Sequence, residues 1–121
     1  MRIVDCDTFL TMPVGTLYAK AATPPEYGFG PLEIKGETLI DLDFYSQRLV
    51  GDFVGNRGSS DRMTTIDALH VGETCAVDFD MEERDSLCEV GQRYAVFEVS
   101  DVEALIVRLQ RALTDSQAGM G

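Results

Sequence analysis

The chain has 121 residues, of which 45% are hydrophobic and 26% are charged, and its formal net charge at pH 7 is −11. That length and composition fit one globular domain and argue against wholesale disorder. The negative charge repels phosphate backbones and anionic membranes, so direct nucleic-acid binding and membrane association are disfavoured. We expect a single domain over residues 1–115 and a flexible tail over residues 116–121.

The chain begins with a predicted helical turn followed by two strands. Asp7 or Thr8 can cap a turn of helix that ends before Pro13. Apolar and polar residues then alternate over residues 16–21 and 31–37, which predicts two strands that pair with each other.

The connector between these strands, ATPPEYGFGP, holds three of the four prolines. Proline lacks the amide donor of a strand ladder, so the connector predicts an exposed and fairly stiff loop. Tyr27 and Phe29 could anchor a partner protein there, because interface hot spots favour aromatic residues. In one alternative Phe29 folds back onto the core, and in another the loop borders a small-molecule pocket.

The middle of the chain predicts three more strands and one helix. Strict alternation favours a strand over residues 40–45, with a helix over residues 42–50 as the alternative. A serine-capped helix is predicted over residues 61–70, where apolar residues recur at helical spacing. Two further alternating strands are predicted, one over residues 74–79 with Cys75, Val77 and Phe79 on one face, and one over residues 93–99.

The last predicted element is an amphipathic helix over residues 100–113. Ser100 and Glu103 have the spacing of a capping box, which marks a helix start. An apolar stripe is predicted to face the core and consists of Val102, Leu105, Ile106, Leu109 and Leu113. The pattern predicts an α+β fold: an antiparallel or mixed sheet of about five strands, in the order β-β-β-α-β-β-α, with its helices packed on one face.

The negative charge is concentrated between the last two predicted strands. Residues 59–101 carry −8 of the −11, and the segment CAVDFDMEERDSLCEV holds six carboxylates and one arginine. Four acids from Asp78 to Glu89 fall at positions 1, 3, 5 and 12 of a calcium loop, but Glu83 stands where that loop needs glycine. The flanks are predicted strands, so we predict no metal site and interpret the segment as a solvated strand-loop-strand connection.

No catalytic or cofactor motif accompanies these acids. Two carboxylates could act as acid and base, but nothing in the sequence indicates that one is buried. His70 and Cys75 lack a nucleophile signature, and the glycines around Lys35 match neither nucleotide-binding loop. We predict no cofactor and a non-enzymatic role, with an enzyme that uses Asp85 or His70 as an alternative, because small folds can host catalysis without a local motif.

The cysteines and the hydropathy indicate the compartment. Cys6, Cys75 and Cys88 lack the spacing of a redox or metal motif, and their odd number leaves at least one unpaired. The first residues lack the apolar run of a signal peptide, and no segment approaches the ~20 apolar residues of a membrane span. These features predict a reducing, cytoplasmic location.

Two parts of the sequence resemble small acidic proteins encoded by phages and prophages. They are MRIVDCDTFLTMPVGTLYAK continued by GPLEIKGET, and DFDMEERDSL followed by YAVFEVSDVEALI. The resemblance implies an accessory protein that blocks a host nucleic-acid machine, such as a restriction or CRISPR complex, by occupying its basic groove. It carries no site residues over to this chain.

Charge and resemblance together predict a non-enzymatic protein that binds a partner protein with a basic surface. The sequence is compatible with a monomer and with a dimer. The predicted binding residues are Asp78, Asp80, Glu82, Glu83, Asp85, Tyr27 and Phe29. In one alternative the negative charge serves only to keep the domain soluble. In another the chain is a small-molecule-binding or sequestering protein.

Overall fold

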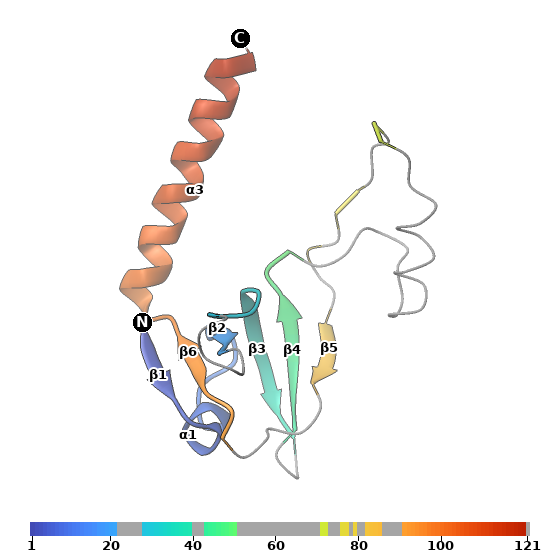
Figure 1. Ribbon diagram of the computed structural model, residues 1–121, viewed down its shortest axis with the longest axis vertical. Helices are drawn as coiled ribbons and strands as arrows, with labels where there is room; N and C mark the ends of the chain where they lie inside the picture. The colour runs from blue at the N-terminus through green and yellow to red at the C-terminus, as the bar shows by residue number, and fades with distance from the viewer. Residues whose placement is uncertain are drawn as a thin grey trace.

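The computed structural model describes residues 1–21, 28–39, 43–50, 71–72, 76–77, 79, 82–85 and 91–120. These residues form two helices and a six-stranded antiparallel sheet, in the order β-α-β-β-β-β-β-α (Figure 1). The strands are β1 (Arg2–Val4), β2 (Leu17–Lys20), β3 (Glu33–Thr38), β4 (Phe44–Arg48), β5 (Glu82–Asp85) and β6 (Tyr94–Val96). The helices are α1 (Cys6–Leu10) and α3 (Val99–Met120). The predicted α+β class is confirmed, while the number and order of the strands differ from the prediction.

The strands lie in the spatial order β1-β6-β2-β3-β4-β5. The predicted pairing of β2 with β3 is confirmed, with Leu17 opposite Ile34. β6 lies between β1 and β2 and pairs with both, so a strand from near the C-terminal end of the sequence joins the two N-terminal strands of the sheet. β5 occupies the far edge and pairs with β4 alone among the described strands.

Two strands were missed by the sequence pattern. β1 is three residues long, which is too short for alternation to identify it. β5 lies inside the acidic segment, which we expected to be a loop at this point; that expectation is wrong for residues 82–85. Charged residues are common on edge strands because they discourage edge-to-edge aggregation, so an acidic composition is compatible with β5.

The strand predicted from residue 40 begins at Phe44, and the helix alternative over residues 42–50 is wrong. Residues 40–42, the helix predicted over residues 61–70 and half of the strand predicted over residues 74–79 lie outside the described residues.

Helix α1 is a single turn capped by Asp5, not by Asp7 or Thr8 as predicted. The Thr8 amide donates to Asp5 Oδ1 over 2.9 Å, and this bond lowers the pKa of Asp5. A five-residue helix is far shorter than the ~12–15 residues that isolated helices need, so α1 depends on packing.

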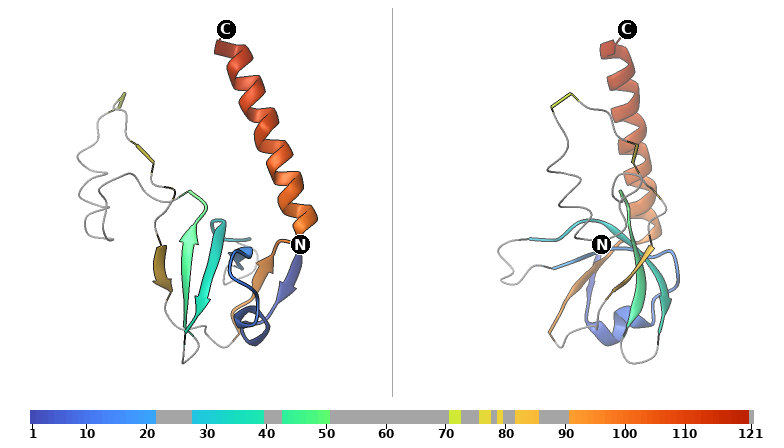
Figure 2. Two further views of the ribbon diagram at one scale, coloured as in Figure 1. Left: turned by 180° about the vertical axis from the view of Figure 1, so that it is seen from behind. Right: turned by 90° about the vertical axis from the view of Figure 1, so that its right-hand side faces the viewer.

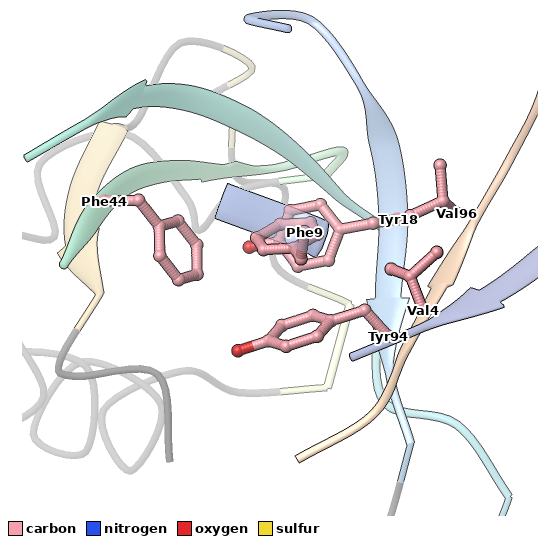
Figure 3. Packing of buried hydrophobic residues seen from close by; sticks show 6 residues of the cluster. All are labelled: Val4, Phe9, Tyr18, Phe44, Tyr94 and Val96. Atoms are coloured by element: carbon pink, nitrogen blue, oxygen red, sulfur yellow. The ribbon is translucent and has the colours of Figure 1, made fainter. Parts of the chain in front are cut away.

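An aromatic cluster supplies that packing and forms the centre of the core. Phe9 of α1 is fully buried, and its ring stacks on Tyr94 with centroids 4.1 Å apart and planes 6° apart. Tyr18 and Phe44 lie 4.6 and 5.1 Å from the same ring. Figure 3 shows these rings directed toward one another from α1, β2, β4 and β6. The buried cluster consists of Val4, Phe9, Tyr18, Phe44, Tyr94 and Val96.

Helix α3 projects away from the sheet, and its C-terminal end lies far from every strand (Figures 1 and 2). The predicted inward stripe is therefore wrong for most of its length: Ile106, Leu109 and Leu113 are 49%, 56% and 59% exposed. The prediction failed because periodicity shows which residues share a face but not what covers that face. Of the two described helices, α1 packs on the sheet, although the sequence predicted it only as a helical turn.

The start and end of α3 also differ from the prediction. The helix begins at Val99, and Asp101 accepts the amide of Glu98 over 3.0 Å, so the side chain three residues into the helix closes the cap. Asp101 also accepts a hydrogen bond from the N-terminal amine of Met1, and this contact lowers the pKa of the Asp101 carboxyl. The helix continues to Met120 through residues expected to form a tail.

Two findings bear on the predicted location. Cys6 is disulfide-bonded, and the second cysteine lies outside the described residues. Disulfides persist mainly in oxidising compartments, so this bond does not support the predicted reducing compartment. The cytoplasmic location stays a prediction. Among the described helices, neither has the length and apolarity that a bilayer crossing requires.

Candidate protein-binding surface

The sheet edge formed by β5 carries the described part of the predicted acidic site. Glu82 lies opposite Gln47 of β4, and Glu83 lies opposite Ser46. Both glutamates are exposed. Successive strand residues point to opposite faces, so the two carboxylates flank the edge and do not form one flat patch.

An exposed aromatic residue adjoins this edge. Phe79 is 62% exposed, and its carbonyl oxygen accepts a hydrogen bond from Gln47 Nε2. The sequence pattern had placed Phe79 and Val77 on an apolar strand face, but both are exposed. Gln47 thus lies beside both Phe79 and Glu82. We define the acidic edge as Gln47, Phe79, Glu82 and Glu83.

The other predicted binding residues are divided between described and undescribed parts of the chain. Asp78, Asp80 and Tyr27 lie outside the described residues. Asp85 is the last residue of β5, opposite Phe44. Phe29 is 49% exposed, outside the buried cluster, and pairs with Ala21 in an isolated bridge. That bridge extends the β2 ladder into the connector, where the sequence predicted no ladder.

The acidic edge packs closely against the middle of the sheet. A Cβ atom on Gly36 of β3 would lie 2.9 Å from Tyr45 Cβ and 3.2 Å from Glu82 Oε2. The Glu82 side chain therefore reaches across β4 to β3. Only glycine leaves room for this approach, because real Cβ atoms essentially never come within 3.0 Å of another heavy atom.

A buried polar network lies beneath α1. Lys35 Nζ lies 5.9 Å from the centroid of the Phe9 ring and donates to the Gly36 carbonyl over 3.1 Å and to Thr38 Oγ1 over 2.8 Å. Thr38 in turn donates to the Leu10 carbonyl, so the network ties α1 to β3. Burial lowers the pKa of Lys35, since an apolar setting disfavours the charged amine.

A second set of buried polar contacts joins β2 to β4. The Tyr18 hydroxyl lies 2.6 Å from Ser46 Oγ, which donates to Glu33 Oε1 over 3.3 Å. Tyr18, Ser46 and Lys35 are all buried. Their burial favours a structural role over contact with a substrate. No three metal-ligating side chains gather among the residues that the structure describes.

An apolar groove of about 540 Å³ lies at the base of α3. One wall is the connection between α1 and β2, from Met12 to Leu17. The other wall is the end of β6 with the first turn of α3, including Phe97, Val99 and Val102. We call this feature the basal groove.

Comparison with known proteins gives no further guide to the site. No protein-family model matches the chain, and no curated protein or solved structure matches it.

The sequence pattern missed the basal groove and the exposure of Phe79. Met12 to Gly15 lie between the predicted helical turn and the strand predicted over residues 16–21, so no face could be assigned to their apolar side chains. Phe79 alternated with Asp78 and Asp80, which is typical of a half-buried strand. A signal was present in the position of Phe79, since it is the only aromatic residue within the acidic segment.

Proposed function

We propose that this protein is a non-enzymatic binding protein whose acidic edge engages a basic surface on a partner protein, such as a component of a nucleic-acid-handling complex. The observation that carries the proposal is the position of Phe79, exposed beside Glu82 at the sheet edge. An aromatic anchor next to charges is a common composition of interface hot spots.

The proposal assigns different tasks to the charge and to the aromatic ring. The net charge of −11 steers a basic partner toward the protein over about one Debye length, ~10 Å at 0.1 M salt. Phe79 then supplies contact area that excludes water. Because Glu82 and Glu83 flank the strand on opposite faces, an extended basic segment lying along β5 fits better than a flat surface.

Two competing functions stay predictions. Small-molecule binding was inferred from the connector, whose residues 22–27 lie outside the described residues. Catalysis through His70 or Asp85 draws no support from the buried network, since Lys35 and Tyr18 are buried away from solvent.

Affinity capture from the native host tests the proposal. We expect the protein to retain a basic partner at low salt, and the double variant Glu82→Lys, Glu83→Lys to weaken capture at least about tenfold. The matched control reverses two exposed acids elsewhere, Asp7→Lys with Asp115→Lys, and changes the net charge equally. Equal loss in both double variants would show that the overall charge, and not the acidic edge, determines binding.

The aromatic anchor is tested by a second pair of variants. Phe79→Ala should weaken the same capture, while Phe29→Ala, which removes a similarly exposed ring elsewhere, should not. If Phe29→Ala abolishes capture and Phe79→Ala does not, the connector and not the acidic edge is the binding site.

A further inference from the structure

Helix α3 carries an exposed apolar seam with coiled-coil spacing. Its 22 residues span about 33 Å at 1.5 Å per residue. Apolar residues recur along it at alternating intervals of three and four, the spacing with which two helices pack side by side. We define the α3 seam as Val99, Val102, Ile106, Leu109 and Leu113. The last three are about half exposed, so within the described structure the seam is largely uncovered.

The α3 seam and the basal groove are one continuous surface. Val99 and Val102 belong to both, because they line the groove and begin the seam. The apolar surface therefore runs from Val14 on the α1–β2 connection, through the first turn of α3, to Leu113. The basal groove is the broad end of this apolar surface, and the outer half of the α3 seam is its narrow end.

We propose that two copies of this chain associate through α3 in an antiparallel pair. The outer half of each seam then covers the basal groove of the other copy, and the broad end of one surface meets the narrow end of the other. An interface of this kind is isologous, since the same surface is used by both copies.

The length of the α3 seam indicates that the partner covering it is a second copy of this chain. From Val99 to Leu113 the seam covers about two heptads, whereas sustained coiled coils need about three to four. Helix pairing alone is therefore too short, and the basal groove supplies the additional apolar surface. Because seam and groove are both present on each chain, a second copy provides matching surfaces at both ends.

The orientation follows from the charge. Residues before α3 carry −10 of the −11, while α3 carries three acids and two bases. A parallel pair would place two strongly acidic domains side by side. An antiparallel pair separates them by much of the ~33 Å helix, well beyond the Debye length of ~10 Å at 0.1 M salt.

The positions beside the seam are compatible with self-association. They are occupied by Glu103, Leu105, Gln110 and Ala112, of which one is charged. In the antiparallel pair, Leu109 lies opposite Ile106 of the second copy, near the two-fold axis. A charged residue at position 109 would thus be buried in the interface.

Analytical ultracentrifugation tests the proposal on the full chain. We expect a concentration-dependent species of twice the 13.3 kDa chain mass. Leu109→Glu should raise the dimer dissociation constant at least about tenfold. The matched control is Val107→Glu: Val107 is 54% exposed against 56% for Leu109, but lies off the seam, so its dissociation constant should change less than about twofold.

The groove is tested separately by Val14→Glu, which changes an exposed residue of its wall. The antiparallel pair requires that this variant also weaken the dimer about tenfold or more. Circular dichroism of each variant establishes that α3 is still helical. A monomeric wild type, equal effects of Leu109→Glu and Val107→Glu, or a dimer unaffected by Val14→Glu would each overturn the proposal. A small apolar molecule retained in a monomer and seen by native mass spectrometry would overturn it too.

Discussion

The central position of Phe9 predicts a large loss of stability for Phe9→Ala. The Phe9 ring is fully buried on a helix of only five residues, and it contacts the rings of Tyr18, Phe44 and Tyr94. Without it, α1 keeps the Cys6 disulfide and the hydrogen bond from Thr38 to the Leu10 carbonyl but loses its fully buried side chain, and so short a helix is unstable alone.

The size of the effect follows from the burial. Truncating a buried Phe to Ala costs about 3–5 kcal/mol of unfolding free energy. We expect about 3 kcal/mol, the lower end of this range, because the hydrogen bond from Thr38 to the Leu10 carbonyl still ties α1 to β3. A chain of this length has a total stability of roughly 6–18 kcal/mol at ~0.05–0.15 kcal/mol per residue, so the variant loses a sixth to a half of it. The midpoint of thermal unfolding should fall by roughly 10–15 °C.

Urea unfolding followed by circular dichroism measures this change. Phe29→Ala is the matched control, because it removes the same ring from a site that is 49% exposed, and should cost less than about 1 kcal/mol. The reasoning would be refuted if Phe9→Ala cost less than about 1 kcal/mol, or if the two variants were equally destabilised.

Two further predictions concern the sheet and the start of α3. Gly36→Ala should lower the unfolding free energy by about 1–3 kcal/mol, because its Cβ would lie 2.9 Å from Tyr45 Cβ, whereas Gly119→Ala, with open space around it, should raise it by up to ~1 kcal/mol. Thermal melts that shift both variants in the same direction would contradict this. The N-terminal amine lowers the pKa of Asp101 below its ordinary 3.8, so the stabilisation it gives is present above that pH and is lost as the pH falls through the folded-state value. The stability difference between wild type and Asp101→Asn should therefore shrink below about pH 3.8, and a difference that stays constant from about pH 5 to 2 would count against the contact.

Local patterns predicted the elements whose signals are local. Alternation identified β2 and β3 and their pairing, and apolar residues at helical spacing identified α3. The helical turn that ends before Pro13 was recognised, although its cap is Asp5 and not Asp7 or Thr8. These features depend on residues within a few positions of one another.

Features that depend on distant contacts were not predictable in the same way. β5 pairs with β4 across more than thirty residues, and its acidic composition disguised it as a loop. The stripe of α3 was correctly recognised as apolar, but what lies against Leu109 depends on where the helix leaves the sheet. Even the aromatic core depends on β6 being inserted between β1 and β2, which no sequence interval reveals.

The candidate site was predicted in part. Glu82 and Glu83 are exposed as expected, but strand geometry distributes them over two faces of an edge. The sequence pattern placed Phe79 on the face of a predicted strand opposite Asp78 and Asp80, whereas Phe79 is 62% exposed and its carbonyl accepts a hydrogen bond from Gln47. The acidic edge is therefore a combination of a predicted charge and an aromatic residue whose position the sequence misassigned.

Amide chemical shifts provide the most direct test of the acidic edge as the binding surface. Titration of the isotopically labelled protein with an extended Arg- and Lys-rich peptide should shift the amides of Gln47, Phe79, Glu82 and Glu83 while leaving the outer half of α3 unchanged, and a peptide of the same length with neutral residues should shift none of them. If the basic peptide leaves these four amides unchanged, or shifts amides all over the acidic protein equally, the acidic edge is not the binding surface.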